Sequence, residues 1–373
     1  MTYSPSPDDT IGGDAPESCF LSCDWGTTSF RLRLVQTNNL QILAELKNHE
    51  GITATFQSWL SAQKPASERL AFYRDTLQAQ ITALQTSLND TNVSALPPIK
   101  PLSGIPLIIS GMASSSIGMQ ELPYKSLPFN TNGEDLQVAI FEATASYPHP
   151  ILLLSGVRST DDVMRGEETQ LIGCFPLRSG KQASLGGGQG DGESQGRQES
   201  IFIFPGTHSK HVRVRDNQVV GLRTYMTGEY FHLLTKHSIL AGSIAESAGL
   251  TLTPNAQPVE NGRQLPPTPF QQGVLDSIDA NLLHQSFQVR THQVLGQMSK
   301  EDNYHYLSGL LIGSECRDLL GTCLPITVVS DGTLQQQYAQ ALQTLVITGV
   351  QLQDLNQAVI RAHARLCKSF LGK

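Results

Sequence analysis

The chain has 373 residues, which is long for one small core and favours two domains. Its composition, 39% hydrophobic and 16% charged, supports packed cores and excludes a disordered or fibrous protein. The formal net charge of −7 argues against a broad surface for nucleic acids or anionic membranes.

Residues 1–18 are polar and rich in proline and glycine, so we expect a disordered tail rather than a secretory signal. The apolar runs that follow are too short to span a membrane. The six cysteines are scattered, without a C-x-x-C pair or zinc-like spacing, which indicates free thiols in a reducing compartment. These features predict a cytoplasmic protein.

The first part of the chain alternates strand and helix patterns. Apolar alternation around a turn at Gly26 predicts a β-hairpin over residues 20–35, and a further strand is expected over 41–46. Apolar residues at helical spacing predict a helix over 59–88, followed by a proline-rich loop over 97–106. The remaining elements expected here are strands at 107–109 and 151–154 and a helix within 162–175.

Residues 184–200 form a tract rich in Gly, Gln and Ser that cannot bury a core. No strand leads into it and no apolar helix follows it, so we expect a surface insertion loop rather than a phosphate loop. It lies near the expected domain boundary. The predicted organisation is an N-terminal lobe over 19–183 and a C-terminal lobe over 201–373.

The second part again begins with strands and continues with helices. Strands are expected over 201–214 and 219–226, with a turn at 216–217, and a polar loop over 251–269. The later elements are expected to be helices at 230–240, 273–295, 304–319, 334–345 and 354–370 and a buried strand at 325–329. Because strands open each half and helices follow, the sequence predicts an α/β protein with two similar lobes.

A first polar segment follows the strand that ends at Asp24, where Gly26, Thr27 and Thr28 come next. Glycine lets the backbone approach a ligand closely, and amides and hydroxyls suit phosphate oxygens. A carboxylate there could anchor Mg²⁺, often through water. The alternative is an ordinary hairpin turn in which Asp24 accepts backbone hydrogen bonds.

A second segment of the same character holds Gly206, Thr207, His208, Ser209 and Lys210 in one turn between strands. A plain hairpin would use Asn-Gly or Asp-Gly, so this density of polar groups favours ligand chemistry over a polar β-turn. Two such segments about half a chain apart suggest a nucleotide held between two lobes.

The richest acidic cluster contains Asp162, Arg165, Glu167 and Glu168. A kinase acting on an alcohol needs a carboxylate that accepts the hydroxyl proton, and the three acids are candidates, while Arg165 could hold an anionic group. The alternative is a helix N-terminus with favourable early acids. Asp162 and Glu167 are placed ahead of Glu168.

Two further patterns are weaker. The turn at Ser330, Asp331 and Gly332 follows a strand, and a nucleoside could lie beside it. The alternative is a simple turn. Gly309 and Gly313 lie four residues apart in an apolar stretch, which is typical of close helix packing as well as of a site. The histidines are dispersed, and the spacing supports neither a metal-ligand set nor a Ser/His/Asp arrangement.

Together these segments resemble the 2-dehydro-3-deoxygalactonokinase family of the actin-like sugar-kinase superfamily. The matching stretches are 24–28, 111–112 through 121–124, 162–170, 205–210, 226–229 and 308–313. The resemblance implies ATP-dependent phosphorylation of 2-dehydro-3-deoxy-D-galactonate, or a close sugar acid, at its 6-hydroxyl. It also implies two ribonuclease-H-like lobes that close on Mg-ATP. The expected partners are ATP and the sugar acid, and a homodimer is compatible with this interpretation.

The resemblance also assigns roles by position. Asp24 would hold Mg²⁺, and the nucleoside would lie near Gly309, Gly313 and 330–332. The phosphates would meet Gly26, Thr27, Thr28, Gly206, Thr207, His208, Ser209 and Lys210, and the sugar acid would meet Arg31, Arg165, Thr227 and Glu229.

Two departures from the family pattern stand out. Where the family commonly has Gly, Arg, Gln and Trp, this chain has Ser114, Ser116, Ile117 and Met119. His211 stands where a tryptophan often follows the second segment. The missing arginine leaves open whether the substrate derives from galactonate or gluconate. An exopolyphosphatase-like phosphatase and a non-catalytic nucleotide-binding module are the alternative functions on the same fold.

Overall fold

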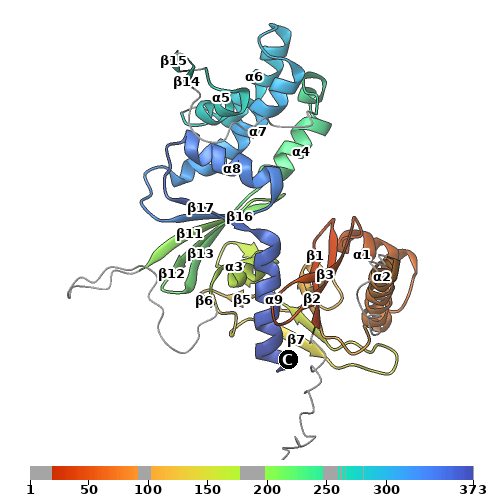
Figure 1. Ribbon diagram of the computed structural model, residues 1–373. Helices are drawn as coiled ribbons and strands as arrows, with labels where there is room; N and C mark the ends of the chain where they lie inside the picture. The colour runs from red at the N-terminus through yellow and green to blue at the C-terminus, as the bar shows by residue number, and fades with distance from the viewer. Residues whose placement is uncertain are drawn as a thin grey trace, which may run out of the picture.

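The computed structural model describes residues 19–90, 102–176, 198–246, 259–260, 263–264, 266–279 and 281–372. These residues form an α/β structure on two six-stranded mixed sheets. Figure 1 shows the helices packed around the strands. The predicted α/β class is confirmed. No helix among the described residues is both long enough and apolar enough to cross a membrane.

The first sheet has the order β3-β2-β1-β4-β8-β7. Its strands are β1 (Cys19–Trp25), β2 (Phe30–Gln36), β3 (Ile42–Asn48), β4 (Leu107–Gly111), β7 (Val138–Phe141) and β8 (Ile151–Leu154). Strands β1, β2 and β3 are antiparallel, whereas β1, β4 and β8 are parallel. Every residue of β4 and β8 is buried, as expected for central parallel strands that are covered on both faces.

The second sheet has the order β17-β16-β11-β12-β13-β6. Its strands are β6 (Phe129–Asn130), β11 (Glu199–Phe204), β12 (Ser209–Arg215), β13 (Gln218–Tyr225), β16 (Ile326–Ser330) and β17 (Val350–Asp354). Here β11, β12 and β13 are antiparallel, and β11, β16 and β17 are parallel. The strand directions around β11 therefore repeat those around β1.

Smaller elements complete the strand inventory of the described residues. A three-stranded sheet joins β5 (Lys125–Ser126), β9 (Val157–Arg158) and β10 (Val163–Met164), and β14 (Val259–Glu260) pairs with β15 (Arg263–Gln264). Asp162 lies between β9 and β10, and the rest of the acidic cluster follows β10.

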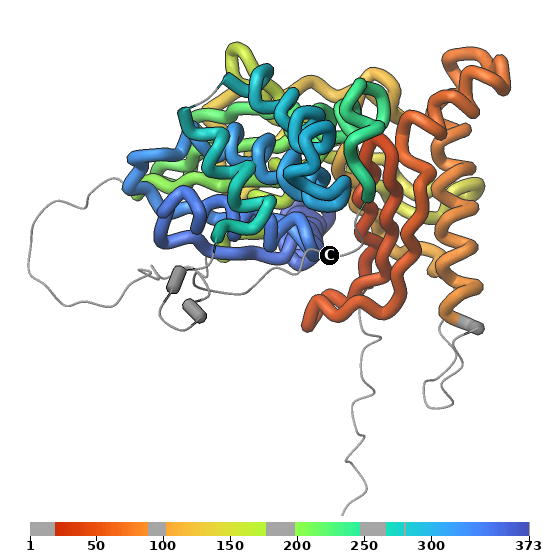
Figure 2. The backbone as a smooth tube through the Cα atoms, turned by 90° about the horizontal axis from the view of Figure 1, so that it is seen from above, coloured from red at the N-terminus to blue at the C-terminus, as the bar shows by residue number. Residues whose placement is uncertain are grey.

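The helices cover the sheets in layers. Their bounds are α1 (Ile52–Ser61), α2 (Arg69–Asp90), α3 (Glu167–Cys174), α4 (Thr227–His237), α5 (Pro269–Asp276), α6 (Leu282–Val294), α7 (Lys300–Cys316), α8 (Gly332–Thr344) and α9 (Leu355–Leu371). Helix α2 packs on the outer face of the first sheet, and α5, α7 and α8 pack on the second. Seen from above in Figure 2, strands β1 to β3 and helix α2 (red to orange) lie to one side of the later elements (green to blue).

Helices α3 and α9 share one hydrophobic core with residues of both sheets. They approach so closely that a Cβ on Gly173 would lie 1.7 Å from the carbonyl oxygen of Ala358. Although α9 comes last in the chain, it contacts α3 and β1 and lies between the sheets in Figure 1. The predicted domain boundaries stay predictions, and the C-terminal helix of the second range packs against the first sheet.

Two ranges that were each predicted as one continuous helix are interrupted in the structure. The range 59–88 is broken between α1 and α2, where Gln63 has a φ of 50° and Pro65 precedes a short 3-10 turn. The range 273–295 is broken between α5 and α6, because the Asn281 side chain accepts a hydrogen bond from the Leu283 amide and starts a new helix. Strands β7 and β17 and the two-residue strands β5, β6, β9, β10, β14 and β15 were not predicted.

Three loop predictions fall partly outside the described residues. Positions 184–197 of the insertion lie there, and Glu199 and Ser200 at its end already belong to β11. Part of 97–106 and most of 251–269 also lie outside.

Candidate active site

One cleft of about 390 Å³ is lined by segments from both sheets and by the β9–β10 region. The β1–β2 turn supplies Asp24, Gly26 and Thr27, and the β11–β12 turn supplies Gly206, Thr207, His208 and Lys210. Its other walls include Gly111, Met112, Tyr124 and residues 163–167. The two polar segments therefore line the same cleft.

The β1–β2 turn is fixed from below by the start of α1. The amide of Ile52 donates to the carbonyl of Gly26 at 2.9 Å, and the amide of Thr53 donates to Thr27 at 3.1 Å. Thr27 and Thr28 remain exposed, but Thr28 does not line the cleft. On the other side, Gly111 has a φ of 87°, and a Cβ there would lie 2.6 Å from the carbonyl oxygen of Trp25, so only glycine fits.

Asp24 lies at the end of β1, half-buried, beside the side chains of β2. Burial raises the pKa of its carboxyl group above the ordinary value. The guanidinium groups of Arg31 and Arg33 oppose this shift, and the carboxylate of Glu167 adds to it. Asp24 and Glu167 are thus two neighbouring carboxylates on one cleft wall.

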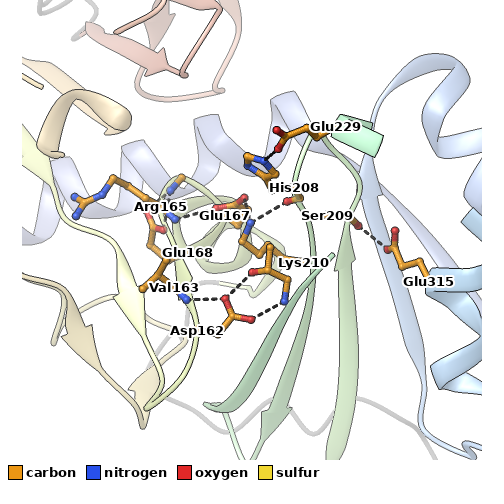
Figure 3. Close-up of polar contacts among 12 residues, drawn as sticks. Asp162, Val163, Arg165, Glu167, Glu168, His208, Ser209, Lys210, Glu229 and Glu315 are labelled. Carbon is orange, nitrogen blue, oxygen red and sulfur yellow. Dashed lines mark hydrogen bonds and ion pairs between the residues drawn. The ribbon is translucent and has the colours of Figure 1, made fainter. Parts of the chain in front are cut away.

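Glu167 is the only one of the three predicted acids that lines the cleft. One of its oxygens lies 3.4 Å from Nζ of Lys210, and the other accepts a hydrogen bond from the Arg165 amide at 3.0 Å. Figure 3 shows Glu167 and Lys210 pointing toward one another from α3 and β12. The pair joins the two sides of the site.

Asp162 instead connects β10 to β13. Its oxygens accept hydrogen bonds from the amide and hydroxyl of Thr224, at 2.6 and 2.7 Å, and from the amide of Val163 at 2.7 Å. Its carboxylate does not line the cleft. The structure therefore gives Asp162 a structural role between two strands and does not bring it to the reacting groups.

Glu168 is fully buried at the start of α3. Both of its oxygens accept the Gly166 amide, at 3.0 and 2.8 Å, and one accepts the Thr169 hydroxyl at 3.1 Å. Burial, with a smaller contribution from Glu167, raises the pKa of Glu168 to about 8. It faces the interior of the protein and not the cleft.

Replacing Glu168 with glutamine is expected to remove a pH dependence of stability. The folded pKa of about 8 lies above the ordinary value of 4.5, so the folded state favours the protonated group. Its stabilising contribution is complete below about pH 4.5 and is lost as the pH rises through about 8. The melting temperature of Glu168→Gln relative to wild type should therefore rise between about pH 5 and pH 8. A difference that does not change with pH would contradict this assignment.

The side chains at the end of the β11–β12 turn point alternately to opposite faces, as they do in the strand that follows. His208 and Lys210 line the cleft, whereas Ser209 is buried and donates to Oε1 of Glu315 at 2.6 Å. The Lys210 ammonium also donates to the His208 carbonyl at 2.8 Å. The structure thus places Ser209, predicted to contact phosphate, on the opposite face.

Helix α4 supports this turn from behind. The Glu229 amide donates to the Thr207 carbonyl at 3.0 Å, and the Glu229 carboxylate lies 2.5 Å from Nε2 of His208. A Cβ on Gly228 would lie 2.6 Å from the Gly206 carbonyl oxygen. Thr227 and Glu229, predicted to bind the sugar acid, do not line the cleft and instead support the turn.

The two predicted arginines differ in their placement. Arg31 donates to Oδ1 of Asn356 at 2.5 Å and does not line the cleft. Arg165 lines the cleft and stacks on Tyr124, 4.2 Å from the ring centroid. Its Nη1 also donates to the carbonyl of Ser114 at 2.7 Å, so the guanidinium is held in one orientation.

The residues predicted near the nucleoside fall into two groups. Gly309 and Gly313 face α5, where a Cβ would lie 2.0 Å from the Phe270 carbonyl oxygen or 2.5 Å from Oγ of Ser277. They serve helix packing and lie away from the cleft wall. Residues 330–332, in the turn between β16 and α8, do not line the cleft either, and Asp331 there accepts a hydrogen bond from Asn356 at 3.2 Å.

Glu315 and Asn356 were not singled out from the sequence. Glu315 was recognisable as one acid within the apolar stretch of α7, and a buried charge there requires partners. Asn356 gave no signal, because its partners Arg31, Arg33 and Asp331 lie far away in the chain.

Known proteins are similar to this chain over most of its length. The chain is 30% identical over 358 residues to 2-dehydro-3-deoxygalactonokinase of Escherichia coli (strain K12), covering 92% of this chain and 98% of that protein. A Rhizobium meliloti (strain 1021) protein named as a probable 2-dehydro-3-deoxygalactonokinase is 30% identical over 361 residues, covering 93% and 96%.

A crystal structure of a Sinorhizobium meliloti protein, described as a 2-dehydro-3-deoxygalactonokinase, superposes with a TM-score of 0.70 at 26% identity. The match covers 94% of this chain and 96% of that one. The family model described as 2-keto-3-deoxy-galactonokinase matches residues 24–366. This chain therefore belongs to the 2-keto-3-deoxy-galactonokinase family.

Proposed function

We propose that the protein is an ATP-dependent kinase that phosphorylates the 6-hydroxyl of 2-dehydro-3-deoxy-D-galactonate or a close 2-keto-3-deoxy sugar acid. The observation that carries the proposal is the cleft where Asp24, Glu167 and Lys210 meet in a chain of this family. The names of both curated relatives support this activity over the phosphatase and binding-module alternatives.

The phosphates of ATP would lie between the two turns. Amides and hydroxyls near Gly26, Thr27, Gly206 and Thr207 suit phosphate oxygens, and Lys210 supplies a positive charge that is only 7% exposed. In a site with little water such charges act strongly on a developing negative charge. Positioning and charge neutralisation would therefore provide most of the rate enhancement.

The cleft also fits Mg²⁺, which would offset the charge of the phosphates. Magnesium keeps several waters and is usually bound through one or two carboxylates together with substrate phosphates. Asp24 provides one such carboxylate in the cleft, beside the turns that would hold the phosphates. Asp24 is the residue that we propose to hold the ion, through water.

Glu167 is the residue that we propose to accept the proton of the sugar hydroxyl. It lines the cleft, whereas Asp162 and Glu168 do not. Arg165, held by Tyr124 and Ser114, is the cation that would face the carboxylate of the sugar acid.

The finer fold assignment is part of the same proposal. The repeated strand order and directions around β1 and β11 support two ribonuclease-H-like lobes of the actin-like ATPase type. Closure of the lobes would exclude water, so that the sugar hydroxyl receives the phosphoryl group.

A coupled assay of ADP release over a panel of 2-keto-3-deoxy sugar acids tests the proposal. We expect ADP release that depends on the sugar acid and is fastest with the galactonate-derived compound. Phosphate release without sugar would instead indicate a phosphatase. Binding of ATP without sugar-dependent ADP release would indicate a nucleotide-binding module.

A further inference from the structure

Beneath the β11–β12 turn lies a buried carboxylate with four hydrogen-bond donors. Glu315 on α7 is 2% exposed. Its Oε1 accepts the Ser209 hydroxyl at 2.6 Å and lies 2.9 Å from Nε2 of His211. Its Oε2 accepts the Tyr338 hydroxyl at 2.6 Å and the Thr227 hydroxyl. These donors use nearly all of the acceptor capacity of a carboxylate.

The four donors come from three elements, of which β12 also supplies a cleft residue, Lys210. Ser209 and His211 belong to β12, Thr227 begins α4, and Tyr338 comes from α8. Because side chains alternate along a strand, bonds to Ser209 and His211 fix the direction of Lys210, which faces the cleft. The Ser209–Glu315 bond is visible at the right of Figure 3.

Thr227 extends the same connection to α4. The next residues of that helix, Gly228 and Glu229, contact the carbonyls of Gly206 and Thr207. One buried carboxylate thus joins the end of the turn to the helix that supports its beginning. Taking a charge out of water is costly, so a carboxylate in this place contributes more to a defined geometry than to net stability.

We infer that Glu315 is a positioning residue for the ATP phosphates, acting through the β11–β12 turn. The inference rests on the proposed kinase function. Glu315 does not line the cleft and touches no substrate; it holds Lys210 and the Thr207 backbone where the transferring phosphate would lie. A small displacement of such groups is enough to weaken both binding and turnover.

Replacement of Glu315 by glutamine in the full-length protein tests this role. The amide keeps the shape but offers one acceptor oxygen instead of two. We expect the KM for ATP to rise about 10-fold and kcat to fall about 10-fold, with the KM for the sugar acid nearly unchanged. Ser209→Ala removes the contact of the turn with Glu315, together with a 3.3 Å hydrogen bond from the Tyr338 hydroxyl. It should change the same two constants in the same direction, which covers the case in which Glu315→Gln does not fold.

Tyr306→Phe is the matched control. It removes one hydrogen bond on the same helix, from the Tyr306 hydroxyl to Asp276 at 2.9 Å, at a place remote from the cleft. We expect it to lower the melting temperature and leave the KM for ATP unchanged. If Tyr306→Phe raises the KM for ATP as Ser209→Ala does, the effect is general destabilisation and the role is overturned.

The same measurements separate this inference from the proposed function. A wild-type protein without sugar-dependent turnover overturns the kinase proposal, and this role with it. A wild-type protein with turnover, and Glu315→Gln and Ser209→Ala variants that keep the wild-type KM for ATP, overturn the positioning role alone.

Discussion

Asp24→Asn is expected to lower kcat by about 10³-fold while the protein stays folded. The substitution keeps the size of the side chain and removes the charge that we propose to hold Mg²⁺ through water. Because burial raises the pKa of Asp24, the folded state already disfavours that charge, so its loss should not lower the melting temperature. The rate is measured by ADP release, and the fold by thermal unfolding.

The control for this variant is Asp161→Asn. Asp161 is exposed, accepts the Ser159 hydroxyl at 2.9 Å and does not line the cleft. The Asp161→Asn substitution removes one negative charge, as Asp24→Asn does, a short distance along the chain from Glu167. We expect wild-type turnover from this control. Near wild-type turnover from Asp24→Asn would refute the assignment of the first phosphate segment.

Most of the strands could be predicted from local patterns in the sequence. The run at 151–154 is apolar throughout, and its burial on both faces fixes it as a central strand. The helix at 59–88 failed because apolar spacing continues across Pro65, where the backbone cannot continue the helix. Periodicity finds a helical face, but a single proline or a capping side chain decides where the helix ends.

The site shows the same division between local and distant causes. Ser209 faces away from the side of the strand that carries His208 and Lys210. This follows from strand alternation and could have been predicted from the sequence. The partner of Ser209 was not, because Glu315 reaches it only through the packing of α7 on the second sheet. Contacts between residues so far apart in the chain are set by the tertiary fold.

The choice among the three acids shows this limit most clearly. Asp162, Glu167 and Glu168 lie within seven positions of one another and have the same chemistry. Their roles are separated by Thr224, Lys210 and the Gly166 amide, which pair with one acid each. Two of these three partners belong to the second sheet, so no local pattern could distinguish the acids.

Glu167→Gln is therefore expected to lower kcat by about 10²- to 10³-fold without weakening ATP binding. The amide can still accept the hydrogen bond from the Arg165 amide, so the start of α3 should keep its conformation. Removal of the carboxylate 3.4 Å from Lys210 leaves the ammonium free to attract phosphate, and ATP should bind at least as tightly as in wild type. Titration calorimetry with a non-hydrolysable ATP analogue measures the binding.

The Asp162→Asn variant tests whether Asp162 is the proton acceptor or has the structural role between β10 and β13. An asparagine in this place cannot accept on both oxygens from the Thr224 amide and hydroxyl, so the β10–β13 connection should weaken and the melting temperature should fall. Its kcat should stay within about 10-fold of wild type, because the carboxylate does not line the cleft. The opposite pattern, a folded Asp162→Asn variant without turnover beside an active Glu167→Gln variant, would move the proton acceptor to Asp162. Because the two variants exchange one oxygen for one amide nitrogen in the same way, a difference between their rates reports which of the two side chains reaches the cleft and not the loss of charge itself.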